Sequence, residues 1–179
     1  MQVALLRGVN VGGKNILPMR DLAAMFEKAG CEQVRTFIQS GNVLFSANAV
    51  VSEKLVTAIA AMIAERFGYR TPVILRTARE LQDVLVSNPF LKGGGDLNSL
   101  HVMFLADRPS AGKVAGLDPN RSAPDAFVVR GRDVYLHLPN GAAKTKLSNA
   151  WFDSQLSTVS TGRNWRTVGK LLQLMEAAT

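Results

Sequence analysis

The sequence predicts an α+β protein made of two similar halves, and three observations support this. Short apolar and β-branched runs are bounded by Gly, Asn, Asp and Ser, as strands of antiparallel sheets are. Longer segments repeat apolar residues every three to four positions, as amphipathic helices do. The order strand, helix, hairpin, helix, strand occurs once clearly in the first half of the chain and once approximately in the second.

In the first half, strands are expected at four short apolar runs. These runs cover residues 2–6, 34–39, 42–46 and 71–76. Ser40-Gly41, between the second and third runs, is typical of a hairpin turn.

Three helices accompany these strands. The first is expected to begin near Pro18, whose missing N–H costs nothing in a first helical turn, and to end at Gly30. Ser52 is expected to cap the second helix. Thr77 and Glu80 form the capping box of the third.

The second half repeats this plan loosely. Strands are expected over residues 100–106, 126–130 and 133–138, with a brief extended piece near Val159. A short helix is expected over residues 110–117, a second helix carries Leu147 and Trp151, and a last helix presents Trp165. This order is the split βαβ arrangement of ferredoxin-like units. We therefore predict two ferredoxin-like halves with mostly antiparallel sheets, residues 1–90 and 97–179, joined by a Gly-rich linker over residues 91–96.

Composition limits the choice of location and partners. The chain of 179 residues has a net charge of +7, which favours acidic partners. No apolar run approaches the roughly 18 residues of a membrane helix, so no membrane partner is expected. The N-terminus has no signal-peptide pattern, and the single cysteine, Cys31, cannot form an internal disulfide. A cytoplasmic protein is expected.

The stretch from Arg7 to Asn15 combines glycines, amides and cations without an acid. Glycines permit positive φ and let another group approach bare backbone N–H groups. We predict that the N–H groups of Gly12 and Gly13, with Lys14 and Arg7, hold an anion. The alternative is that the glycines only turn a tight corner and Lys14 points into solvent.

The same stretch comes close to a phosphate-binding P-loop. Gly8 to Lys14 fits G-x-x-x-x-G-K, but Asn15 stands where Ser or Thr should hold magnesium. Pro18 would also fall where the helix of a P-loop needs a backbone N–H. A nucleotide triphosphatase is therefore not predicted.

A second basic segment, Thr161 to Trp165, is expected to open the last helix. Helix N-termini attract anions, so Arg163 could contribute to a site there. Alternatively, Thr161 or Asn164 only caps the helix while Trp165 packs in the core. Lys144-Thr145-Lys146 is another basic turn.

Residues with catalytic chemistry are few. His101 and His137 lie on separate predicted strands without metal-ligand spacing, so neither a metal nor another cofactor is expected. His137 is the only candidate for a general base, although a structural role is the alternative. Cys31 is expected to be inert, and Ser40 lacks the G-x-S-x-G context of a nucleophile.

An RNA-recognition surface would need exposed stacking aromatics on a sheet. The RNP1 pattern is missing, and the strand aromatics are expected in or near the core: Phe37, Phe45, Phe104 and Tyr135. Nucleic acid remains a possible partner through net charge alone.

The chain resembles domain-of-unknown-function family 1697. The resemblance rests on residues 5–15 and 36–45, and on later similarities at Pro139-Asn140-Gly141, Lys146-Leu147 and residues 161–168. It implies a mainly bacterial protein with two ferredoxin-like halves, and no established reaction, substrate or cofactor. It also suggests that the polar residues of these motifs share one site: Arg7, Asn10, Lys14, Ser40, Asn42, Lys146, Arg163 and Asn164.

These observations predict a cytoplasmic protein that binds a phosphorylated or other small anionic ligand. One alternative is an enzyme that acts on a phosphorylated metabolite or nucleotide, with Lys14 and Arg163 stabilising developing charge. Another is a nucleic-acid-binding module. The sequence does not decide whether the protein is an enzyme.

Overall fold

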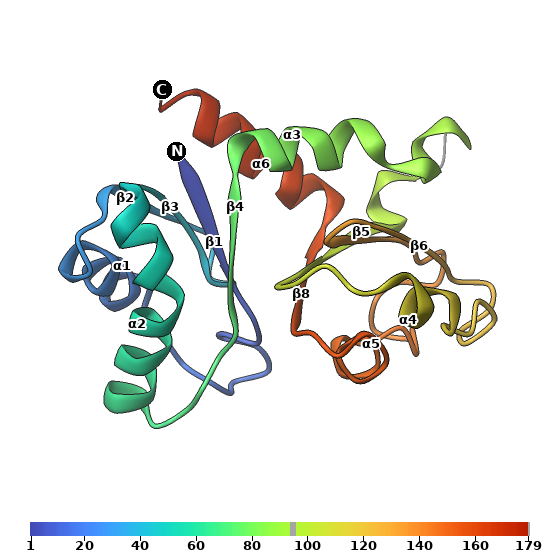
Figure 1. The fold of residues 1–179 in the computed structure, drawn as a ribbon, viewed down its shortest axis with the longest axis horizontal. Coiled ribbons are helices and arrows are strands. Elements are labelled where there is room, and N and C mark those ends of the chain that lie inside the picture. The colour runs from blue at the N-terminus through green and yellow to red at the C-terminus, as the bar shows by residue number, and fades with distance from the viewer. Residues whose placement is uncertain (94–95, 179) are drawn as a thin grey trace. The chain divides into compact units, whose positions relative to one another are not determined.

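The structure of the chain, a computed structural model, describes residues 1–93 and 96–178. These residues form a mixed α/β protein with two four-stranded antiparallel sheets (Figure 1). The chain divides into two compact units. The first unit contains residues 1–81 and 171–179, and the second contains residues 82–170.

The first unit is built around one sheet and two helices. Its elements are β1 (Gln2–Leu6), α1 (Met19–Lys28), β2 (Glu32–Phe37), β3 (Asn42–Ser46), α2 (Ala49–Phe67) and β4 (Val73–Thr77). The strand order is β2-β3-β1-β4, with all neighbours antiparallel. The central strand β1 is apolar and buried from Val3 to Leu6, whereas the edge strand β2 is polar and mostly exposed.

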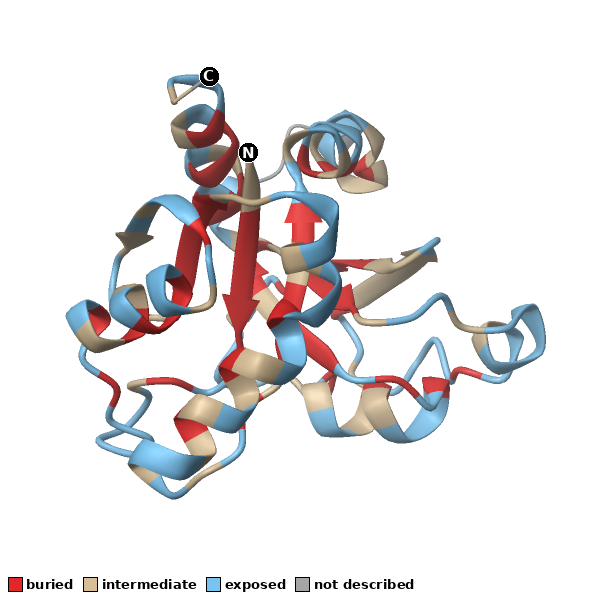
Figure 2. Cartoon of the chain, turned by 60° about the vertical axis from the view of Figure 1, so that its left-hand side comes forward, coloured by how far each residue is buried: buried red, intermediate tan, exposed pale blue. Residues whose placement is uncertain are grey.

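The core of the first unit lies between its sheet and the apolar faces of α1 and α2. Leu22 and Phe26 from α1 meet Ile59 and Ile63 from α2, and the ring of Phe26 lies 5.4 Å from that of Phe45 on β3. The buried strands and half-buried helix faces are visible in Figure 2. Burying such side chains is the main stabilising contribution, at about 1.5–3 kcal/mol each.

The second unit has the same plan. Its strands and helices are β5 (Leu100–Leu105), α4 (Ala111–Ala115), β6 (Ala126–Arg130), β7 (Asp133–His137), α5 (Asn149–Leu156) and β8 (Ser160–Asn164), preceded by two short 3-10 helices, η1 (Pro89–Gly93) and η2 (Leu97–Ser99). The strand order is β6-β7-β5-β8. Helices α3 (Ala78–Ser87) and α6 (Trp165–Glu176) each contribute residues to both units.

The two sheets also agree in register. Arg76 on β4 lies opposite Val3 of β1, and Arg163 on β8 lies opposite Val102 of β5. Strand by strand these are equivalent positions, and both arginines are buried, with 1% and 8% of their surface exposed. The sequence repeats its plan only loosely in the second half, but the register gives the two units the same internal design.

Two predicted element boundaries were wrong. Ser52 does not cap α2: the cap is Asn48, whose side chain accepts a hydrogen bond from Val51 N, while Ser52 lies inside the helix and accepts one from Gln2. Thr161 to Asn164 do not open a helix. They form β8, because they pair with β5, and only Asn164 caps α6 by accepting from Thr167 N.

The predicted boundary between the halves, residues 91–96, differs from the division of the structure. The units divide between Leu81 and Gln82, inside α3, and the end of the chain is grouped with the first unit. Residues 94 and 95 of the predicted linker lie outside the described residues. Among those that the structure describes, no helix is long and apolar enough to span a membrane.

Candidate functional site

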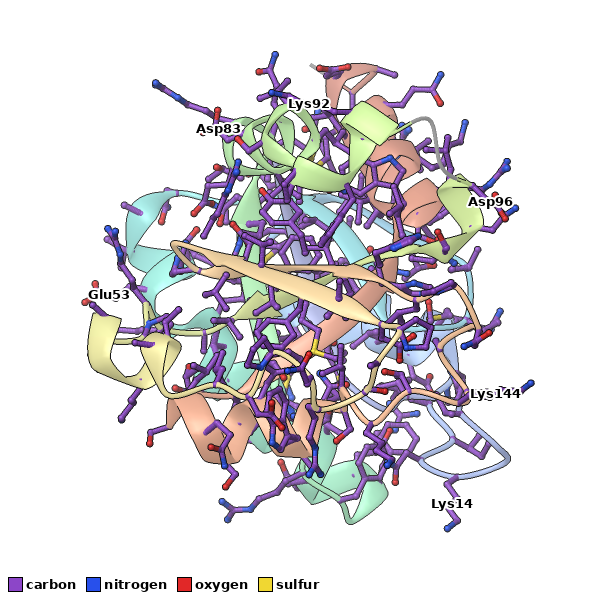
Figure 3. All side chains as sticks on the ribbon, turned by 90° about the vertical axis from the view of Figure 1, so that its right-hand side faces the viewer. Lys14, Glu53, Asp83, Lys92, Asp96 and Lys144 are labelled. Carbon is purple, nitrogen blue, oxygen red and sulfur yellow. The ribbon has the colours of Figure 1, made fainter. Side chains whose placement is uncertain are left out.

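The N-terminal glycine loop is a small hairpin. Lys14 N donates to Val11 O over 3.0 Å and Asn10 N donates to Asn15 O over 3.1 Å. The two residues between, Gly12 and Gly13, have φ values of +57° and +73°. Positive φ at both central positions is the requirement of a type I′ turn, which explains this glycine pair. Lys14 extends from the tip of the loop into open space (Figure 3).

Asn10 fastens this loop to the rest of the first unit. Its Oδ1 accepts from Leu17 N over 2.8 Å, and its Nδ2 donates to Leu17 O over 2.9 Å and to Gln39 O over 2.8 Å. The last of these bonds joins the glycine loop to the hairpin turn that connects β2 and β3. Two segments singled out separately in the sequence therefore meet at one side chain.

Ser40 and Asn42 lie in and beside the same hairpin turn. Asn42 is completely buried, and its Nδ2 donates to Phe37 O and to Ser40 Oγ. These bonds give both residues a structural role in holding the turn. Their predicted role in anion binding stays a prediction.

Arg7 lies at the end of β1 beside a hollow of about 620 Å³ in the first unit. Arg70 lines the same hollow, as do small residues of α2 including Ala60 and Ala64. Thr71 Oγ1 donates to the backbone oxygen of Arg7 over 2.6 Å, which fixes the chain at this point. The first unit thus brings Arg7 together with a second arginine that the sequence did not single out.

The second unit contains a smaller pocket, of about 340 Å³. It lies on one face of the sheet, where Met103 of β5, Leu136 of β7 and Leu147 supply its apolar wall. The polar side chains around it come from three segments, β5, residues 145–149 and β8: His101, Thr145, Ser148, Asn149 and Asn164. A pocket of this size with few polar groups suits a small molecule.

Two helices begin at the pocket. Ser148 caps α5 by accepting from Trp151 N, and Asn164 caps α6 by accepting from Thr167 N. The N-terminus of a helix carries a partial positive charge and N–H groups without intrahelical partners. Both dipoles therefore make this end of the pocket electropositive.

Strand pleating places the predicted site residues Arg163 and Asn164 on opposite faces of the sheet. Asn164 lies opposite His101 and shares its face, whereas Arg163 lies opposite Val102 on the other face. The guanidinium of Arg163 donates to Thr161 Oγ1 on that second face, so only its backbone lines the pocket. Burial lowers the pKa of Arg163 to about 10. Lys146 is exposed between the lining residues Thr145 and Leu147.

The residues of the predicted anion site therefore belong to both units. The first unit holds Arg7, Asn10, Gly12, Gly13, Lys14, Ser40 and Asn42, and the second holds Lys146, Arg163 and Asn164. Asn10 brings the glycine loop and the hairpin turn together within the first unit. Asn164 and the backbone of Arg163 meet at the pocket of the second.

A family model described as "Protein of unknown function (DUF1697)" matches residues 1–135. This chain belongs to the DUF1697 family. The matched region contains the glycine loop, the hairpin turn and the pocket residue His101. No curated protein matches the DUF1697 chain significantly.

Among solved structures, the DUF1697 chain is similar to the conserved bacterial protein SP0830 from Streptococcus pneumoniae. The TM-score is 0.75 with 21% sequence identity, and the match covers 98% of this chain and 97% of that one. At this identity the likeness concerns the fold.

His101 lines the pocket of the DUF1697 chain, but the sequence analysis assigned it no function. Its Nδ1 is buried and makes no hydrogen bond to the described residues. Burial lowers the pKa of the imidazole below its ordinary value of 6.5, and the backbone of Ser99 partly opposes this. The alternation of His101, Met103 and Leu105 places His101 on the core face, but a single strand does not reveal that this face is hollow there.

We expect His101 to make the stability of the DUF1697 chain depend on pH. Because burial lowers its pKa, the unfolded chain binds more protons than the folded chain as pH falls below about 6.5. The stabilising contribution is therefore present above that value and is lost as pH falls through the lower folded pKa. Urea unfolding at pH 7.5 and pH 5 should show a smaller pH effect in His101→Gln than in the native chain. An unchanged difference would contradict this assignment.

The other candidate catalytic residues of the DUF1697 chain, His137 and Cys31, do not line the pocket. His137 stacks on Phe90, 5.8 Å between ring centres, on the sheet face opposite the pocket. Cys31 is buried, which raises its pKa to about 11 and keeps the thiol protonated at neutral pH. Among residues 1–93 and 96–178, no three His, Cys, Asp or Glu side chains are grouped as a metal site requires.

Proposed function

We propose that the protein binds a small ligand with an apolar body and an anionic head in the pocket of the second unit. The observation that carries this proposal is the convergence of two helix N-termini, capped by Ser148 and Asn164, on one apolar cavity. The apolar body would contact Met103, Leu136 and Leu147, and the head would lie at the helix ends. Phosphate and carboxylate groups both suit such ends.

Polar groups at the pocket would orient the bound ligand. His101 and Asn164 lie side by side across neighbouring strands, so both could donate to a ligand oxygen. Lys146, exposed on the segment that forms one wall, would add long-range attraction for an anion. Arg163 would not reach the ligand with its guanidinium, because that group lies on the opposite face.

Filling the pocket provides the test. Gly162 faces the cavity, and an added Cβ would meet its nearest neighbour, Met103 Cγ, at 3.9 Å, an ordinary contact. Gly162→Leu should therefore fold and occupy the space of the ligand. Gly112→Leu is the matched control, because Gly112 on α4 has open space around it and does not line the pocket.

The probes are nucleoside monophosphates, sugar phosphates and aliphatic carboxylates, screened by thermal shift and measured by titration calorimetry. A binding probe should lose affinity by about tenfold or more in Gly162→Leu, equivalent to 1.4 kcal/mol or more, and keep it in Gly112→Leu. Equal affinity in both variants would place the ligand elsewhere. The absence of any binding probe would refute the proposed ligand class.

An enzyme acting on such a ligand is the second candidate, and His101 favours it. A half-buried imidazole with a lowered pKa is neutral at pH 7 and can accept a proton from a bound molecule. His101→Gln should then abolish turnover of any substrate found while leaving its binding largely intact. The nucleic-acid alternative has less support, since Phe45, Phe104 and Tyr135 are buried and cannot stack on bases.

We also propose that each unit is a ferredoxin-like split βαβ unit. The order β1-α1-β2-β3-α2-β4 in the first unit and β5-α4-β6-β7-α5-β8 in the second supports this assignment. We further propose a cytoplasmic location. The single cysteine of the chain supports this, because it is buried and forms no disulfide.

A further inference from the structure

Aliphatic side chains are exposed to solvent on the two loops that Asn10 joins. These clasped loops are residues 7–18 and residues 38–41. Val11, Ile16 and Ile38 are 62%, 59% and 49% exposed. Each of the three is next in sequence to Asn10 or to a residue that bonds to Asn10, namely Asn15, Leu17 or Gln39. Three exposed β-branched residues therefore lie beside the hydrogen bonds that join the two loops.

Ile38 is also held in an unfavourable backbone conformation. Its φ is +50°, in the left-handed region that β-branched residues almost never adopt. Its exposed side chain gains little from packing in the core, so burial does not explain why isoleucine stands there. Strained residues of this kind are held by their surroundings, and they cluster at functional surfaces. The bond from Asn10 to Gln39 holds the next residue in place.

The charged residues within the clasped loops have one sign. Residues 7–18 and 38–41 contain Arg7 and Lys14 and no acidic residue. Lys14 projects from the tip of its loop (Figure 3). A partner that contacts the exposed aliphatic side chains would therefore meet a basic surround, which an acidic partner complements.

We propose that the clasped loops dock an acidic protein segment, whose apolar side chains contact Val11, Ile16 and Ile38 while its carboxylates lie near Lys14. A rigid, strained presentation suits a partner of defined shape, which a fluid bilayer is not. The two cations of the clasped loops, Arg7 and Lys14, are also fewer than the cluster of four to eight that usually holds a protein to anionic lipid. Aliphatic side chains offer no aromatic face for nucleobases.

Ile38→Asn separates a docking role from a structural one. Asparagine tolerates the left-handed region, so this substitution should raise the unfolding midpoint by about 2–4 °C while removing the apolar contact. Val50→Asn is the matched control, because Val50 is 65% exposed in the same unit but lies on α2, outside the clasped loops. Lys14→Glu tests the charge.

The probe is a displayed library of random 12-residue peptides, selected on the full-length protein. Enriched peptides should be rich in Asp, Glu and apolar residues. Synthetic copies should bind at least tenfold more weakly to Ile38→Asn and to Lys14→Glu, and equally to Val50→Asn. Peptides that bind Ile38→Asn as well as the native chain would overturn the proposal, as would an Ile38→Asn variant that unfolds earlier. Sedimentation with phosphatidylserine vesicles, lost in Lys14→Glu, would instead assign the surface to membranes.

Discussion

Replacing Gly41 by alanine is expected to lower the free energy of unfolding by about 2–5 kcal/mol, because two costs add. The φ of Gly41 is +75°, where an L-residue loses about 1–2 kcal/mol. A Cβ there would also stand 2.8 Å from Leu6 Cβ and 3.5 Å from Val9. Both neighbours are buried in the core and have little room to move, and overpacking of this kind costs about 1–3 kcal/mol.

Gly68→Ala is the matched control for this substitution. Gly68 ends α2 with the same φ of +75°, but an added Cβ would meet nothing within 4 Å. Urea unfolding followed by far-ultraviolet circular dichroism should give a loss of about 1–2 kcal/mol for Gly68→Ala and a larger loss for Gly41→Ala. Equal losses would mean that the close approach to Leu6 does not limit this position.

The sequence revealed Gly41 as a turn residue but not its second role. Ser40-Gly41 between two β-rich runs predicts a hairpin from local composition alone. The need for glycine comes instead from the backbone bond of Leu6 N to Gly41 O and from the contact with the Leu6 side chain. Leu6 is distant in sequence, so no local pattern could show this contact.

Several features whose determinants are local agreed with their predictions, although the predicted cap of α2, Ser52, did not. The capping box is an example: Thr77 N donates to Glu80 Oε2 over 2.8 Å, and Glu80 N donates to Thr77 Oγ1 over 3.2 Å. Both partners are three residues apart, so the sequence contains the whole interaction. The same reason explains why the sequence predicted that α1 begins near Pro18, which directly precedes its first residue.

Elements that depend on distant partners were not predictable in this way. Residues 160–164 contain Ser, Thr, Gly, Arg and Asn, which favour turns and caps more than strands. They form β8 only because β5, about 60 residues earlier, offers its edge for pairing. This pairing also moves the Arg163 guanidinium away from the helix end where the sequence had suggested it.

The pocket of the second unit shows the same limit. Its wall combines β5, β7, β8 and the segment before α5. The sequence singled out Lys146, Arg163 and Asn164 on two of these segments, but it did not show that they border one cavity with β5. The sequence offers no reason to assign His101 a function, because no further metal ligand or acid–base partner lies near it in the chain. Its significance comes from Asn164, which the sheet register places directly opposite.

Replacing Asn10 by alanine is expected to destabilise the protein by about 3–5 kcal/mol. Alanine removes one accepted and two donated hydrogen bonds, those with Leu17 N, Leu17 O and Gln39 O. Each bond contributes about 1 kcal/mol net, and backbone groups left unsatisfied cost more. The φ of Asn10, +56°, adds the left-handed penalty that asparagine tolerates better than alanine.

Two further variants separate these contributions, measured by urea unfolding and by hydrogen exchange at Leu17 N. Asn10→Gly removes the bonds without the backbone penalty, so it should be less destabilising than Asn10→Ala by about 1 kcal/mol. Asn10→Asp keeps the acceptor for Leu17 N but places a carboxylate against two carbonyl oxygens, and should protect that N–H while still lowering stability. If Asn10→Gly were as stable as the native chain, the clasp between the glycine loop and the hairpin turn would contribute nothing, and Ile38 would owe its conformation to its own turn.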